Sequence, residues 1–199
     1  KRIIKKKKDP RLQKEYKKIL KYKKMIKFVY QNKPLGTGHA VLKTKKLIKD
    51  NFFLMLLPDD LIIKKNCSKS MILIHKRYKA SVMASMNVKK NTVSRWGIYE
   101  MKNKISNSNF VIKDVIEKPS IANAPSNKAV IGRYILPKSI FNKLAKQKKG
   151  KGGEIHITDS IKSLVKEGYT FIGHKFDGKY LDCGSMSGYI KSSLEISKI

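Results

Sequence analysis

The sequence predicts an α/β fold built around a mixed sheet. Segments with strand character alternate with segments of helical periodicity, the pattern of a chain that packs helices on a sheet. Strands are concentrated between residues 81 and 136, which favours a sheet with both parallel and antiparallel neighbours. With 199 residues, 41% of them hydrophobic, the chain is long enough to bury the core of one such domain.

The first part of the chain combines a lysine-rich helix with a very apolar strand. Apolar residues spaced three and four apart predict a helix with a narrow apolar stripe over 1–24. The continuously apolar run at 52–57 is typical of a central strand covered on both faces. The expected elements are, in order, a helix over 1–24, a strand over 26–30, a loop over 31–38, a helix over 40–47 and a strand over 52–57.

The rest of the chain holds four closely spaced strands followed by helices. Pro137 is expected to open a helix, because proline is favoured in the first turn. Thr158 or Asp159 stands in the capping place of a later helix. The expected elements are a helix over 67–78, strands over 81–88, 95–100, 110–117 and 128–136, a helix from 137, a glycine turn over 148–154, a helix over 158–165, a strand over 169–176 and a closing helix over 185–199.

The net charge of +32 raises the question of whether the protein binds nucleic acid. Such a charge attracts polyanions in a salt-dependent way. Nearly all of it is lysine, however, with arginine only at positions 2, 11, 77, 95 and 133. Dedicated nucleic-acid surfaces usually use the arginine fork. We therefore interpret the lysines as solvated faces and expect no specific nucleic-acid partner, with a polyanion-binding protein as the alternative.

No part of the sequence indicates a membrane protein or a disulfide framework. The longest apolar run, 52–57, is far shorter than the roughly 20 residues that cross a bilayer. Cys67 and Cys183 form no CxxC pair. We expect no membrane association and a reducing cytoplasmic location.

Three short acidic motifs and one glycine loop could carry chemistry. Asp59 in LLPDD follows a buried strand and could bind Mg²⁺, or it could belong to a polar turn. Glu117 and Lys118 in EKP could hold a sugar hydroxyl and a phosphate. Asp182 in LDCGS could be a second metal ligand or the cap of the last helix. In PLGTGHA, Gly36 would let backbone N–H groups approach an anion or a base.

The order of the motifs is more informative than any one of them. QNKPLGTGHAVL, FLMLLPDDLI, SRWGIYE, EKP, APSNKAVIGRYIL, GGEIHITDSI and FDGKYLDCGSMSGYIK follow one another along the chain. In sequence and spacing they resemble the UTP–glucose-1-phosphate uridylyltransferases of bacteria, which are nucleotide-sugar pyrophosphorylases. The resemblance covers Ile26 to Glu195. It implies a Rossmann-like mixed sheet of the nucleotidyltransferase type, with residues 1–25 as a lysine-rich helical insertion and 26–199 as the C-terminal part of that domain.

The resemblance also implies a reaction and a metal site. UTP and glucose 1-phosphate would form UDP-glucose and pyrophosphate, by in-line attack of the sugar phosphate on the α-phosphorus. Asp59 and Asp182 would hold Mg²⁺. Lys118 would bind the sugar phosphate and would act, with Asp59, as a catalytic residue. Glu117 would bind the glucose hydroxyls.

Four further positions would bind substrate by the same resemblance. Gly97 and Gly132 would let the backbone approach the sugar, and Gln31 with the Gly36 backbone would read the uracil edge. A homo-oligomer is also implied.

One departure from the family pattern bears on activity. The family's opening segment, of the kind G-x-G-T-R-x-x-P-x-T-K, is nowhere in these 199 residues. We therefore expect a sheet without its first strands, with an unpaired edge and exposed apolar surface. The alternative to an active enzyme is an inactive fragment or remnant of it.

Overall fold

The protein, analysed as a computed structural model, is described over residues 9–199. It divides into two compact units, Lys1–Asn32 and Lys33–Ile199. In the first, the predicted helix is confirmed over its described part as α2 (Pro10–Met25), where the Asp9 carboxylate caps the first turn by accepting the Arg11 N–H at 2.8 Å. The strand predicted over 26–30 is wrong, because a strand needs a backbone partner and no described strand pairs with this segment.

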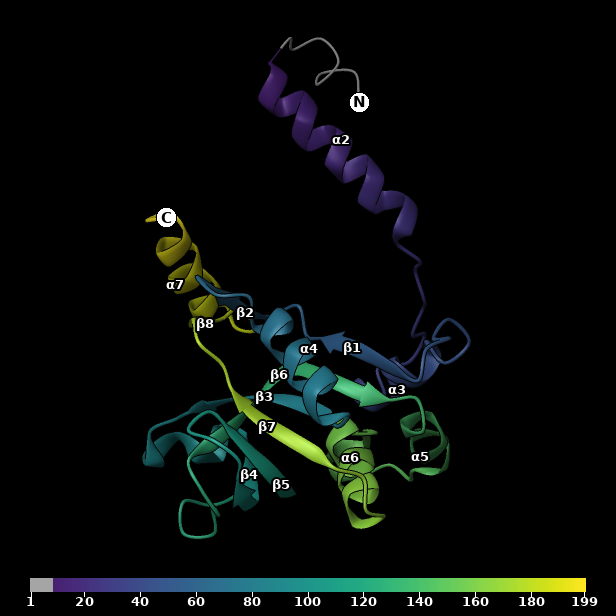
Figure 1. Cartoon of the computed structure of the whole chain (residues 1–199), viewed down its shortest axis with the longest axis vertical. Helices are drawn as coiled ribbons and strands as arrows, with labels where there is room; N and C mark the ends of the chain where they lie inside the picture. The colour runs from purple at the N-terminus through teal and green to yellow at the C-terminus, as the bar shows by residue number, and fades with distance from the viewer. Residues whose placement is uncertain (1–8) are drawn as a thin grey trace. The chain divides into compact units, whose positions relative to one another are not determined.

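The second unit is built on a six-stranded mixed sheet, which confirms the predicted fold class (Figure 1). The β3–β7 pair is parallel, and the remaining neighbours are antiparallel. In spatial order the strands are β1 (Phe52–Leu56), β6 (Lys128–Pro137), β3 (Ser81–Asn87), β7 (Phe171–Lys175), β5 (Asn109–Glu117) and β4 (Gly97–Lys104).

A separate two-stranded ribbon carries two of the three acidic motifs, LLPDD and LDCGS. It pairs β2 (Asp60–Ile63) with β8 (Lys179–Asp182) in antiparallel register, so that Asp60 lies opposite Asp182. Figure 1 shows this ribbon beside α7 (Met186–Ile196), the closing helix predicted from the sequence. Neither ribbon strand was expected, because four-residue strands carry little periodicity and pair across more than 100 residues.

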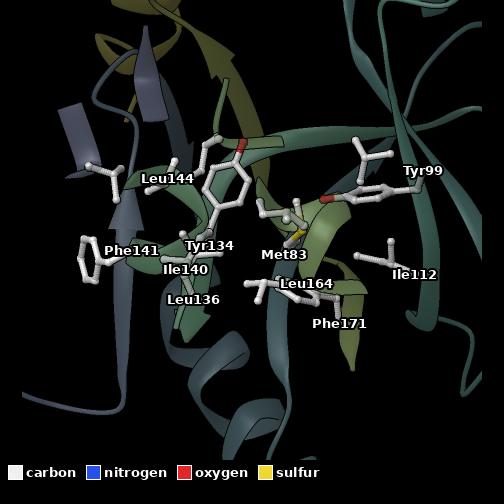
Figure 2. Close-up of a cluster of buried hydrophobic side chains, with 14 of the residues drawn as sticks. Met83, Tyr99, Ile112, Tyr134, Leu136, Ile140, Phe141, Leu144, Leu164 and Phe171 are labelled. Carbon is white, nitrogen blue, oxygen red and sulfur yellow. The ribbon is translucent and has the colours of Figure 1, made fainter. Parts of the chain in front are cut away.

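Helices cover both faces of the main sheet. Alternate residues of β3 point to opposite faces, as the pleat requires: Met83 joins one core cluster, while Val82 and Ala84 join the other. Figure 2 shows the first cluster, where Leu164 of a covering helix lies among Met83 and Phe171. The helical elements are α3 (Thr37–Lys43), α4 (Cys67–Tyr78), η1 (Lys90–Arg95), α5 (Ile140–Lys146), η2 (Lys151–Gly153) and α6 (Ile157–Lys166). No described helix is long and apolar enough to cross a membrane.

Strand β1 differs from its prediction in one respect and agrees in another. Predicted as central and covered on both faces, it instead ends the strand order and, among residues 9–199, pairs with β6 alone. An apolar run indicates that a segment tends to be buried, but it does not show which strands pair with that segment. Leu54 and Leu56 are 36% and 50% exposed, so the expected unpaired edge with exposed apolar side chains is present.

Two helix starts were also placed wrongly. Pro137 is the last residue of β6, where it pairs with Phe52, and α5 begins only at Ile140. A proline is tolerated there because the end of a strand need not donate an N–H. The N-cap of α6 is His156, in place of Thr158 or Asp159, since the helix begins at Ile157, two or three residues earlier than those caps would start it.

Candidate active site

Asp59 and Asp182 are brought together by the β2–β8 ribbon. Asp59 directly precedes β2, and Asp182 is the last residue of β8. The Cys183 N–H donates to the Asp59 carbonyl at 2.8 Å, which closes the open end of the ribbon. The two aspartates, 123 positions apart in the sequence, therefore lie at one end of the same element.

Gly184 marks the place where the two carboxylates converge. A Cβ on Gly184 would lie 3.0 Å from Asp59 Oδ2 and 3.4 Å from Asp182 Oδ1. The Gly184 N–H donates to Asp182 Oδ1 at 2.9 Å. The helix-cap alternative for Asp182 is wrong, because Ser185 caps α7 by accepting the Gly188 N–H at 3.1 Å.

This pair of carboxylates suits a hard cation that also binds phosphate. Among the described residues, no three His, Cys, Asp or Glu side chains are grouped as a metal cage. Mg²⁺ seldom uses such a cage, because it usually takes one or two carboxylates and completes its shell with water and substrate phosphates. The donor set of Asp59 and Asp182 therefore fits Mg²⁺.

The EKP motif is at the end of β5, against the start of β4. Gly97 and Glu117 are direct partners in the β4–β5 ladder. A Cβ on Gly97 would lie 3.1 Å from Glu117 Oε2, so the glycine leaves room for that carboxylate. Lys118 follows in a left-handed conformation, with φ of 45°, and its N–H donates to the Trp96 carbonyl at 3.0 Å. This turn redirects the chain and leaves the Lys118 side chain exposed.

Tyr134 links the acidic ribbon to the EKP strand end. Its phenol is buried in β6, and burial is the main cause that raises its pKa above the usual value. The negative charges of Asp60, Glu117 and Asp59 raise the pKa further. Carboxylates at the end of β5 and in the β1–β2 turn thus both act on one buried hydroxyl, which puts the two motifs within electrostatic range of Tyr134.

Gly132 is tightly packed. Its N–H donates to Asp60 Oδ2 at 2.6 Å, and a Cβ would lie 2.5 Å from both that oxygen and Leu57 Cβ. Packing against the β1–β2 turn therefore explains why only glycine fits at this position. Its contact with sugar stays a prediction, and the N–H that would make it is already bonded to Asp60.

The glycine loop is fixed to the segment before α6. Gly36, with φ of 91°, precedes α3, and a Cβ there would lie 2.9 Å from the Ile155 carbonyl oxygen. The Gly38 N–H donates to that carbonyl at 2.8 Å, and the Ile155 N–H donates to Leu35 O at 2.8 Å. Gln31 belongs to the other compact unit, so the predicted pairing of Gln31 with Gly36 stays a prediction.

Two hollows of the surface differ in their relation to these residues. One of about 310 Å³ is lined by Asp182 and Tyr180, together with the cationic side chains of Arg95 and Lys191. A larger one of about 460 Å³ is lined by β4 and the β4–β5 turn, together with Lys128 and Lys175, and by none of the predicted site residues. We place the site beside the first, because Asp182 of the carboxylate pair lines it.

Sequence reasoning missed three residues that shape this site. Asp60, Arg133 and Tyr180 hold the turn that carries Asp59, as described below. Asp60 and Arg133 lie inside the family-like motifs, but only the fold shows what they contact. Tyr180 lies inside such a motif too, and its partner is 120 positions away.

Comparison with known proteins gives the family of the chain. A family model described as nucleotidyl transferase matches residues 2–199. A UTP–glucose-1-phosphate uridylyltransferase of Pseudomonas aeruginosa is 35% identical over 169 residues, which are 83% of this chain and 60% of that protein. A Streptococcus pyogenes protein, UTP–glucose-1-phosphate uridylyltransferase 2, is 35% identical over 85% of this chain and 58% of its own length.

Solved structures extend the likeness to the fold. A UDP-glucose pyrophosphorylase complexed with UDP-glucose superposes with a TM-score of 0.80 and 39% identity, over 86% of this chain and 66% of that one. The chain spans about 60% of the length of the curated relatives it matches. Given the family match over nearly every residue and the shared mixed sheet, the chain belongs to the nucleotidyl transferase family.

Proposed function

We propose that this protein is a uridylyltransferase that forms UDP-glucose and pyrophosphate from UTP and glucose 1-phosphate. The observation that carries the proposal is the convergence of Asp59 and Asp182 beside Gly184, in the fold of this family. The substrates are those that the names of the relatives state, at 35% identity over most of this chain.

The proposed reaction depends on positioning of the substrates more than on acid–base catalysis. The attacking oxygen of glucose 1-phosphate is already an anion, so no general base is needed. The protein has to align that oxygen with the α-phosphorus and offset the charge of two polyanions. Lys118, exposed at the end of β5, would bind the sugar phosphate, and the adjacent Glu117 would accept hydrogen bonds from glucose hydroxyls beside Gly97.

Asp59 and Asp182 would hold Mg²⁺ in this proposal. Bound Mg²⁺ would supply charge neutralisation for the phosphates of UTP. The two carboxylates contribute by presenting oxygens to one point from opposite strands of a short ribbon. At the nucleotide end, Gly36 and Gln31 would bind the uracil. A homo-oligomer and a cytoplasmic location stay predictions.

The test uses the native full-length product, mixed with UTP, glucose 1-phosphate and Mg²⁺. We expect equal amounts of UDP-glucose and pyrophosphate, measured by chromatography and by a coupled pyrophosphate assay. Asp59→Asn should lose turnover with its thermal unfolding midpoint unchanged. Absence of pyrophosphate from the wild type would refute the proposal. Nucleic-acid binding that persists at physiological salt would instead support the polyanion-binding alternative, since attraction by net charge alone is lost as salt rises.

A further inference from the structure

Asp60, the neighbour of Asp59, uses both carboxylate oxygens to join separate elements. Its Oδ2 accepts the Gly132 N–H of β6 at 2.6 Å, and its Oδ1 accepts the Tyr180 hydroxyl of β8 at 2.5 Å. Hydrogen bonds to an ionised acceptor are shorter and stronger than neutral ones. One half-buried side chain therefore connects the main sheet to both strands of the ribbon.

Arg133 holds the backbone of the same turn. Its Nη1 donates to the Leu57 carbonyl at 2.7 Å and to the Gly132 carbonyl at 2.9 Å, while Nη2 donates to the Asp60 carbonyl. These contacts grip the residues on both sides of Pro58 and Asp59. A planar guanidinium can bind several carbonyls at once, which the single ammonium of lysine does less well. In a chain whose charge is nearly all lysine, an arginine at this position is informative.

The turn and the ribbon together decide where the two site carboxylates point. Asp60 lies opposite Asp182 in the β2–β8 ladder, and Tyr180 is two residues before Asp182 on the same strand face. The bond from Tyr180 to Asp60 thus ties the strand that ends in Asp182 to the turn that carries Asp59. Trp96 packs against the Tyr180 ring at 5.9 Å in an edge-on arrangement, which limits how the ring can move.

We propose that Asp60, Tyr180 and Arg133 are positioning residues that set the relative geometry of Asp59 and Asp182. This inference rests on the proposed function, because it concerns the metal pair of that site. Asp60 acts through its two hydrogen bonds and does not itself bind the metal.

Substitutions at Asp60 and Tyr180 separate geometry from charge. Tyr180→Phe removes one hydroxyl and keeps the ring against Trp96. Asp60→Asn keeps the shape, since its oxygen can accept the Gly132 N–H while its amide donates to the Tyr180 oxygen. Asp60→Ala removes both bonds. If Asp60 only positions the other residues, Asp60→Asn should bind metal like the wild type. If Asp60 were a metal ligand, loss of its charge in Asp60→Asn would weaken metal binding.

The experiment measures Mn²⁺ binding to the native full-length protein by the loss of the free-ion signal in electron paramagnetic resonance. We expect Tyr180→Phe and Asp60→Ala to weaken binding at least about tenfold, as for other residues that orient metal ligands. Asp60→Asn and the control Tyr169→Phe, at an exposed tyrosine near the end of α6, should stay within about twofold of wild type. Thermal unfolding of each variant shows whether it is folded, and Tyr180→Phe tests the inference even where Asp60→Ala does not fold.

Two results would overturn the inference, and they differ. Wild-type affinity in Tyr180→Phe, alongside loss of binding in Asp59→Asn, would leave the metal site intact and refute the positioning role alone. Equal binding by wild type and Asp59→Asn would remove the metal pair itself, and with it both the positioning role and the metal part of the proposed function.

Discussion

Gly184→Ala tests the geometry of the carboxylate pair with a single methyl group. The added Cβ would lie 3.0 Å from Asp59 Oδ2 and 3.4 Å from Asp182 Oδ1, so the nearer oxygen has to move by a few tenths of an ångström. A metal site tolerates about 0.2 Å of error in its ligand distances. The displacement exceeds that tolerance, and we expect Mn²⁺ to bind at least about tenfold more weakly, which is about 1.4 kcal/mol.

The assay compares Mn²⁺ binding by wild type, Gly184→Ala and Gly152→Ala, with thermal unfolding measured for each. Gly184 is exposed and its Cβ would meet the ends of side chains, so little loss of stability is expected. Gly152 has nothing within 4 Å of an added Cβ, and its φ of 71° strains an alanine, so it controls for a methyl group and a general loss of stability away from the carboxylate pair. Unchanged Mn²⁺ affinity in Gly184→Ala would refute the claim that the two carboxylates converge on this point.

Three further predictions concern other parts of the structure. Lys118→Ala should lower turnover on the order of 10²-fold with an unchanged unfolding midpoint, because the side chain is exposed and, in the proposed function, its charge would face developing negative charge; wild-type turnover would remove its role. Leu164→Ala should lower the free energy of unfolding, measured with urea, by about 2–5 kcal/mol, since Leu164 is fully buried beneath the sheet; a loss below this range would contradict the packing. Burial raises the pKa of the Cys67 thiol to about 11, so iodoacetamide at pH 8 should alkylate it far more slowly in the folded protein than in urea; equal rates by mass spectrometry would show that the thiol is accessible.

Elements with a strong local pattern could be predicted from the sequence. The helix at 67–78 matches α4 residue for residue, and β3, predicted over 81–88, ends one residue earlier. Both bury side chains that their own spacing marks as apolar. The pattern failed where pairing decides the outcome: 26–30 is rich in β-branched and aromatic residues like a strand but pairs with none of the described strands, and β2 and β8 are strands because of each other.

The candidate site divides in the same way. Motif order identified Asp59 and Asp182 as a pair, although their spacing of 123 positions could not show that they meet. The supporting bonds from Tyr180 and Arg133 to Asp60 were out of reach, because they depend on the ladder register and on one side-chain rotamer. Sequence motifs indicate which side chains can take part in chemistry. The pairing of distant strands determines which of those side chains lie together.

The central claim, that Asp59 and Asp182 form one metal site for nucleotidyl transfer, is tested most directly by a double-mutant cycle. Pyrophosphate release from UTP and glucose 1-phosphate is measured for Asp59→Asn, Asp182→Asn and the double variant of the full-length protein. Residues that act as a unit give non-additive losses, so each single variant should lose on the order of 10²-fold and the double variant little more. Wild-type turnover in either single variant, or losses that multiply in the double variant, would contradict the claim.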